Sequence, residues 1–287
     1  EWVEVLRQQP AYAPARQALA RLGGDKTLDT ASATALARVF KPVHSRVIVN
    51  VGDSGVDIGS LDLLSRNVLD YTFSEAPTDW YVAAGSWGTT NRWTCSPQWS
   101  WFGGIAELAP VVVWNKRSFT GDITVDMYIA WGMIYGHRKS YKNPNDLNIS
   151  LCANGTDLFS GYTFVVGGWQ NQRTAILKEG RVLAETSETW ALPPVFEDND
   201  PGTYEHHRKW WGIRARKTGN RLQLYFDNKL ALEAVDPNPL QEGRVALWGY
   251  DNRIILSRVR LYCQDPGEVD SSLPAEKWAT RQQLSVE

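Results

Sequence analysis

From residue 45 onward, apolar and polar residues alternate in short stretches that are rich in Val, Ile, Tyr and Thr. Alternation with a period of two is typical of β-strands that bury one face. Gly, Asn and Asp separate many of these stretches and favour tight turns between antiparallel strands. The stretches expected to form strands are 46–51, 68–73, 80–85, 88–95, 111–114, 122–131, 147–152, 162–168, 173–178, 182–186, 209–217, 221–227, 229–234, 244–249 and 254–262. This pattern predicts an all-β protein, a two-sheet antiparallel jelly-roll sandwich.

The N-terminal residues follow a different pattern. Apolar residues recur at helical spacing over 2–22, and two glycines then provide a stop signal. A second short helix is expected over 29–39. Because a single helix pair cannot bury its own apolar face, Trp2, Leu6 and Leu19 are expected to pack on the β-domain or on a partner.

Three parts are therefore expected along the chain. They are a helical segment over 1–44, a β-sandwich over 45–263 and an extended C-terminal tail over 264–287. Within the first part, the Pro, Tyr, Ala and Leu positions of 10–23 resemble the second half of a tetratricopeptide repeat.

Tryptophan is unusually frequent, with 14 in 287 residues, and the densest cluster lies within 92–104. Flat aromatic faces beside amide, carboxylate and guanidinium groups suit sugars, because the C–H face of the ring stacks while the hydroxyls form hydrogen bonds. Tryptophan also fills the thick core of a large β-sandwich, so both interpretations stay open for each of these residues.

Charge and cysteine content narrow the function classes. With 30 basic and 32 acidic residues, the chain offers no electrostatic case for nucleic acid or an anionic membrane. No apolar run reaches the roughly 18 residues of a membrane span. Cys95, Cys152 and Cys263 lack zinc-ligand spacing, so no metal site is expected from them. Three buried thiols are favoured over one disulfide with a free thiol.

Five blocks follow one another in order along the chain: 119–128, 160–169, 222–229, 243–248 and 256–262. Together they resemble the concanavalin A-like lectin and glucanase jelly roll, especially its laminin-G-like and 3-keto-disaccharide hydrolase domains. The resemblance covers 68–263 and implies a carbohydrate-binding or carbohydrate-active module of an exported, bacterial-type protein, periplasmic or secreted. Since this fold hosts lectins, hydrolases, lyases and scaffolds, the resemblance does not define an activity.

Two departures from the family pattern bear on chemistry. Retaining glucanases of this fold carry a Glu-x-Asp-x-x-Glu strand that places nucleophile and acid on one face, and this chain has none. Enzymatic activity therefore stays open, with glycoside hydrolase-like chemistry as one alternative. Many members bind a structural calcium through an Asp on the final strand, where this chain has Ser257. No cofactor is expected, although Asp251 and Asp70 carry oxygen atoms that suit calcium.

Nine residues are candidates for ligand contacts, because aromatic, amide and cationic groups gather around them. They are Trp99, Trp101, Trp114, Lys116, Asn148, Trp169, Asn171, Arg173 and His207. A polar side chain on an alternating strand is equally what a solvated sheet shows, so each has a purely structural alternative. His207 and its neighbour His206 would point to opposite faces of a strand, which disfavours a shared metal ion.

Two functions remain from the sequence. The first is a module that binds or cleaves a glycan. The second is a non-catalytic structural or interaction subunit of a larger protein complex, which would dock through the N-terminal helices and the C-terminal tail.

Overall fold

The computed structural model describes residues 48–51, 54–57, 67–73, 77–91, 100–132, 145–188 and 210–274. The chain divides into two compact units, 1–66 and 67–287. In the first unit, β1 (Ile48–Val51) pairs antiparallel with β2 (Ser54–Asp57). The helices expected over 2–22 and 29–39, with the segment that resembles a tetratricopeptide repeat, lie outside the described residues.

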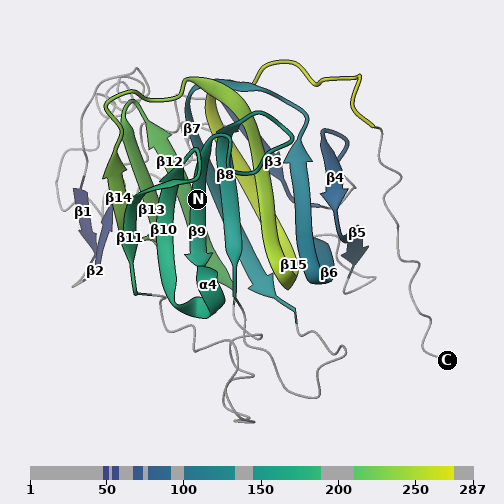
Figure 1. The fold of residues 1–287 in the computed structure, drawn as a ribbon, viewed down its shortest axis with the longest axis horizontal. Coiled ribbons are helices and arrows are strands. Elements are labelled where there is room, and N and C mark those ends of the chain that lie inside the picture. Colours follow the sequence, from purple (N-terminus) through teal and green to yellow (C-terminus); the bar gives the residue numbers. More distant parts are fainter. Residues whose placement is uncertain are drawn as a thin grey trace, which may run out of the picture. The chain divides into compact units, whose positions relative to one another are not determined.

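The described residues of the second unit form thirteen strands joined in one hydrogen-bonded network (Figure 1). A single helical turn, α4 (Gly168–Asn171), follows β9. The strands are β3 (Asn67–Tyr71), β4 (Trp80–Ala84), β5 (Ser86–Asn91), β6 (Ser100–Asn115), β7 (Phe119–Trp131), β8 (Leu147–Ala153), β9 (Tyr162–Gly167), β10 (Arg173–Lys178), β11 (Arg181–Thr186), β12 (Trp211–Thr218), β13 (Arg221–Phe226), β14 (Lys229–Val235) and β15 (Glu242–Asp265). No helix in the described part of the chain is long and apolar enough to span a membrane.

Two long strands, β6 and β15, each contribute to both layers of a sandwich. The first sheet runs β11-β10-β9-β8-β15-β6-β4, and β15 enters it with residues 244–249. The second sheet runs β14-β13-β12-β7-β15, and β15 enters it with residues 252–265. On the far side of β15, the second sheet continues to β3 and to the first part of β6, which pairs with β5. The expected two-sheet jelly-roll sandwich is confirmed, and the described strands pair antiparallel except for β7 and β15, which run parallel.

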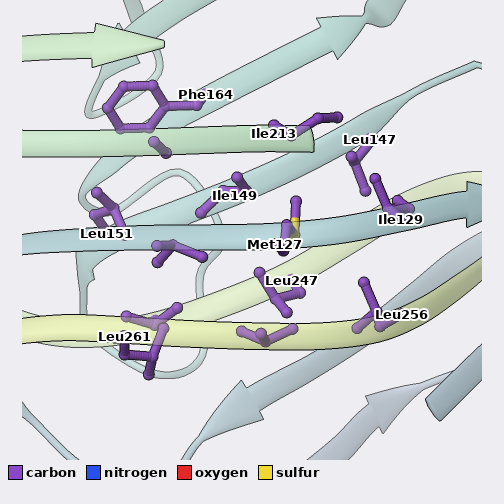
Figure 2. Packing of buried hydrophobic residues seen from close by; sticks show 14 of the residues in the cluster. Met127, Ile129, Leu147, Ile149, Leu151, Phe164, Ile213, Leu247, Leu256 and Leu261 are labelled. Carbon is purple, nitrogen blue, oxygen red and sulfur yellow. The ribbon is translucent and has the colours of Figure 1, made fainter. Parts of the chain in front are cut away.

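The core lies between the two sheets and follows the predicted alternation. Along β7, Ile123, Val125, Met127 and Ile129 are at most 1% exposed, whereas Tyr128 between them is 49% exposed. Figure 2 shows Met127 and Ile129 packed with side chains from β8, β9, β12 and β15. Each fully buried aliphatic side chain contributes about 1.5–3 kcal/mol, so this cluster is the main source of stability.

A hydrogen-bonded group closes one edge of the core. The Tyr162 hydroxyl donates to a carboxylate oxygen of Asp236 across 2.6 Å, and the Lys178 ammonium lies 2.8 Å from the same oxygen. Burial alone would raise the pKa of Asp236, but the hydrogen bonds from Lys178 and Tyr162 outweigh burial and lower it. Burial and the neighbouring carboxylate raise the pKa of Tyr162. The group fixes the segment that leads from β14 to β15.

After β15 the chain returns along the end of the first sheet as a strap over 266–274. Val269 forms an isolated bridge with Arg117, and the Asp270 amide donates to the Lys116 carbonyl across 3.3 Å. The Arg244 guanidinium lies 2.7 Å from the Asp270 carboxylate. This part of the expected C-terminal tail is therefore attached to the sandwich by specific polar contacts.

Candidate functional site

The most unusual backbone in the described chain lies at the end of β9. Trp169 and Gln170 have left-handed conformations (φ 51, ψ 48 and φ 62, ψ 44), and Asn171 also has a positive φ of 61. Each non-glycine residue in this region costs about 1–2 kcal/mol. Position 168 is a glycine because a Cβ there would collide with Val165. Strain of this kind persists only where surrounding structure holds it, and it often marks functional sites.

The left-handed turn displays an indole above a guanidinium. Trp169 is 42% exposed, and the guanidinium carbon of Arg173 lies 4.0 Å from the centroid of its ring. Arg173 also donates to Glu185 on β11 across 3.1 Å. A cation over an indole contributes about 0.5–1 kcal/mol at an exposed site. The stack therefore orients Trp169 at the rim of the first sheet.

A carboxylate and an amide lie beside this turn, at the start of β8. The Asp146 amide donates to the Gly167 carbonyl across 3.0 Å, and the Nδ2 of Asn148 donates to the Asp146 carboxylate across 3.1 Å. A Cβ at Gly168 would lie 3.9 Å from the same carboxylate. Asn148 is buried, and its Oδ1 has no hydrogen-bond partner among the described residues. The turn and the start of β8 form one polar corner.

Next to this corner, the outer face of the first sheet carries aromatic side chains of β15. Trp248 stands opposite Asn148 in the strand register, and its indole N–H donates to the Ser150 hydroxyl across 2.9 Å. Tyr250, two residues further on, lies on the same face and is 48% exposed. Its hydroxyl donates to the Leu108 carbonyl across 3.0 Å, which orients the ring.

The loop after β8 covers the middle of this face. The Leu158 carbonyl accepts hydrogen bonds from Ser150 and from Thr163, so the loop is fixed over the sheet. Phe159 packs edge-on against Trp248, with ring centroids 5.5 Å apart, and remains 41% exposed. The loop thus adds a third exposed aromatic side chain to the outer face of the first sheet, beside Trp169 and Tyr250.

The structure brings together some of the nine candidates and separates others. Trp169, Asn171, Arg173 and Asn148 meet at the polar corner, with Asn171 buried beneath the exposed turn. The remaining five candidates fall in two groups, which are described separately because their outcomes differ.

Trp114 and Lys116 are poor ligand contacts. Trp114 is 1% exposed and packs in a small apolar cluster with Val112, Ala246 and Trp248 on the outer face of the first sheet. Lys116 is also buried, and its backbone joins the far end of β6 to the C-terminal strap. Trp114 therefore supports the aromatic surface from within.

Three candidates lie outside what the structure describes. Trp99 and His207 fall in undescribed segments, and Trp101 stands in β6 with its side chain outside the described part.

Sequence reasoning in turn missed Trp248, Tyr250, Phe159, Asp146 and Glu185. The spacing of Trp248 and Tyr250 on one strand was the available signal, because residues two apart share a face.

The carboxylates considered for calcium are engaged with protein groups. Asp70 accepts from the Nε of Arg258 across 2.8 Å and lies 3.4 Å from the Nε of Arg260. Asp251 accepts from the Leu108 amide across 2.8 Å. Among the residues that the structure describes, no group of three or more His, Cys, Asp or Glu side chains could hold a metal ion.

The two described cysteines, Cys152 and Cys263, are buried free thiols. Burial raises the pKa of the Cys152 thiol to about 11. At neutral pH this thiol is therefore protonated and a poor nucleophile.

Comparisons with known proteins concern the fold. No family model matches the chain, and no curated protein matches it. The carbohydrate-binding module CBM66 from Bacillus subtilis is 16% identical, with a TM-score of 0.43, over 64% of this chain and 95% of that one. A Bacillus subtilis protein of unknown function with a galectin-like fold is 11% identical, with a TM-score of 0.45, over 70% and 96%. The β-glucanase of Bacillus licheniformis is 10% identical, with a TM-score of 0.43, over 68% and 97%. Likeness at this level leaves the function to be argued from the site itself.

Proposed function

We propose that the chain is a carbohydrate-binding module whose site is the outer face of the first sheet, at the end that carries α4. The observation that carries the proposal is the set of three exposed aromatic side chains, Trp169, Tyr250 and Phe159, on the face that also holds Asp146 and Asn148. Apolar faces beside fixed hydrogen-bonding groups match the two sides of a sugar ring.

The size of this surface suits an oligosaccharide. Strands β15, β8, β9 and β10 are consecutive in the first sheet, so Tyr250 and Arg173 are three strand spacings apart. With strands about 4.8 Å apart, the surface between them spans roughly 14 Å. More than one sugar ring fits along such a span.

Binding is proposed rather than hydrolysis, because the chain has no Glu-x-Asp-x-x-Glu strand to supply a nucleophile and an acid. The orienting contacts also favour binding. Arg173 is stacked on Trp169 and the Tyr250 hydroxyl is bonded to the backbone, so both rings are held before a ligand arrives. We also propose that the module acts in the periplasm or outside the cell, where extracellular glycans are found.

The test compares aromatic variants on a glycan array and by titration calorimetry. Trp169→Ala and Tyr250→Ala should each weaken binding about thirtyfold, since removal of an anchor costs about 2 kcal/mol. The matched control is Tyr128→Ala, because Tyr128 is equally exposed but lies on the second sheet. Binding by this control should equal that of the unmodified chain.

Two results would overturn the proposal. The first is an array on which no glycan binds. The second is equal affinity for Tyr250→Ala, Trp169→Ala and the Tyr128→Ala control. Absence of sugar binding together with co-purification in a protein complex would favour the interaction-subunit role instead.

A further inference from the structure

We infer that the Tyr250 end of the proposed site holds a methyl group of the sugar ligand, and that Leu108 selects it. The inference rests on the proposed carbohydrate-binding function and adds a chemical class of ligand to it. The methyl group belongs to a 6-deoxy sugar or to an acetyl group on a sugar, since both present the same apolar surface. Leu108 lies in β6, at the point where this long strand runs beside β15.

Leu108 has an unusual backbone conformation for an exposed apolar residue. Its φ of 52 lies in the left-handed region, and the residue is 59% exposed. This conformation is strained for a residue with a Cβ, and Gly or Asn would adopt it with less strain. Phe73 and Cys152 also have positive φ values, but both are buried in the core, so packing offsets their strain. Burial does not compensate Leu108 in this way.

The same combination of strain and exposure occurs at Trp169. Among the described residues, Leu108 and Trp169 are the two exposed apolar residues whose φ is positive. Strained residues persist where the surrounding structure holds them, and they are concentrated at binding and catalytic sites. Trp169 already belongs to the proposed site through its exposed indole. The conformation of Leu108 therefore points to a second anchor of the same site, next to Tyr250.

Hydrogen bonds on both sides fix the backbone of Leu108. Its amide donates to the Asp251 carboxylate across 2.8 Å, and its carbonyl accepts from the Tyr250 hydroxyl across 3.0 Å. Between Ala106 and Pro110, three residues of β6 face the single residue Asp251 of β15, so Leu108 is the middle residue of a bulge. Bulges change the direction of a side chain, and this one holds Leu108 in place before a ligand arrives.

Leu108, Pro110 and Tyr250 form an exposed apolar platform. Pro110 is exposed and pairs with Tyr250 across the two strands, so both side chains lie on the outer face of the first sheet. Proline has no N–H, and the amide and carbonyl of Leu108 and the hydroxyl of Tyr250 each already form a hydrogen bond. A methyl group on this platform exchanges water for apolar contacts, whereas a hydroxyl group loses its hydrogen bonds to water.

The test uses a glycan array of pairs that differ in the methyl group: L-fucosides with L-galactosides, L-rhamnosides with L-mannosides, and acetylated with deacetylated xylan. The first two pairs report a 6-deoxy sugar and the third reports an acetyl group, so the array distinguishes the two sources. Titration calorimetry then follows with the pair that contains the best binder. The member with the methyl group should bind about tenfold more tightly.

Leu108→Asn separates ligand selection from folding. Asn adopts the left-handed region with less strain than Leu, so the urea midpoint should rise by about 0.3 M. The preference for the member with the methyl group should fall to about twofold or less, because the apolar side chain is lost. Leu108→Met keeps an apolar side chain and should keep the preference. The matched control is Leu230→Asn, because Leu230 is 52% exposed but lies in β14 of the second sheet, and this variant should bind both members as the unmodified chain does.

Three results would overturn the inference and leave carbohydrate binding intact. They are equal or tighter binding of the member without the methyl group, an unchanged preference in Leu108→Asn, and an equal loss of preference in Leu230→Asn. A fall of the urea midpoint and of both affinities in Leu108→Asn would assign Leu108 to folding and overturn the inference as well. If no member of any pair binds, the proposed function itself is wrong.

Discussion

The guanidinium carbon of Arg173 lies 4.0 Å from the Trp169 ring centroid, although the two residues stand on either side of a chain reversal. Gly168 and Arg173 form an isolated bridge, and Trp169, Gln170 and Asn171 between them have positive φ values. Without these conformations the chain could not return so sharply, and Trp169 would not reach Arg173. The backbone strain at 169–171 is thus coupled to the exposed indole.

This coupling predicts that glycine substitutions at two nearby glutamines, Gln170 and Gln172, change the stability of the protein in opposite directions. Gln170→Gly should stabilise the protein by about 1 kcal/mol, because glycine adopts the left-handed region without the steric cost of a Cβ. Gln172→Gly is the matched control, because Gln172 is equally exposed but right-handed (φ −88, ψ −24), and it should destabilise by about 0.5–1 kcal/mol. Urea denaturation measures both values. Equal signs for the two variants would mean that residue 170 carries no strain.

Arg173 is expected to act as a positioning residue for Trp169. Arg173→Met keeps much of the apolar stem but removes the charge, so affinity for a glycan should fall about two- to fivefold through a less ordered indole. The anisotropy of Trp fluorescence should fall in the free variant, because the Trp169 indole is more mobile. Arg221→Met removes a comparable ion-paired arginine from β13 and serves as the control. If Arg173→Met binds the glycan with unchanged affinity, the stack of Arg173 on Trp169 contributes to stability alone and not to binding.

The sequence predicted strands well where one face is buried. In β7 every second residue from Ile123 to Trp131 is in the core, so hydrophobic periodicity alone located the strand. The same periodicity divided β15 into 244–249 and 254–262, because Asp251 and Asn252 between them are typical turn residues. In the structure the strand continues through them as a bulge, where Asp251 has a positive φ of 50 and accepts from the Leu108 amide.

The candidate site could be predicted only where its residues are local. Trp169, Asn171 and Arg173 are close in sequence, and their cluster was visible as an aromatic residue beside polar groups. The burial of Trp114 and the exposure of Tyr250 and Phe159 depend on which part of the outer face the loop after β8 covers. A single sequence does not show which part of a sheet a loop covers. Alternation predicts that a strand has two different faces, but it does not show what packs on each of them.

The buried group around Asp236 should be more important for stability than its single hydrogen bonds indicate. Asp236→Asn removes the charge that pairs with Lys178, and breaking a buried pair costs about 3 kcal/mol. Tyr162→Phe removes one hydroxyl from the same carboxylate and should cost about 1–2 kcal/mol. The free energy of unfolding in urea measures both. A smaller loss for Asp236→Asn than for Tyr162→Phe would show that the ion pair contributes little.

The C-terminal strap should detach in acid. Hydrogen bonds from Ser272, first of all, and from Arg244 lower the pKa of the Asp270 carboxyl from 3.8 to about 2. A carboxyl with a lowered folded-state pKa stabilises the fold fully above its unfolded value, and this contribution is lost as pH falls through the folded value. The stability difference between the unmodified chain and Asp270→Asn should therefore be constant above about pH 4 and decrease towards pH 2. Urea midpoints measured at each pH give this difference directly, because other titrating groups cancel. Ser272→Ala removes the largest lowering effect and should move the acid loss to higher pH, whereas an unchanged profile would show that Arg244 alone holds the strap.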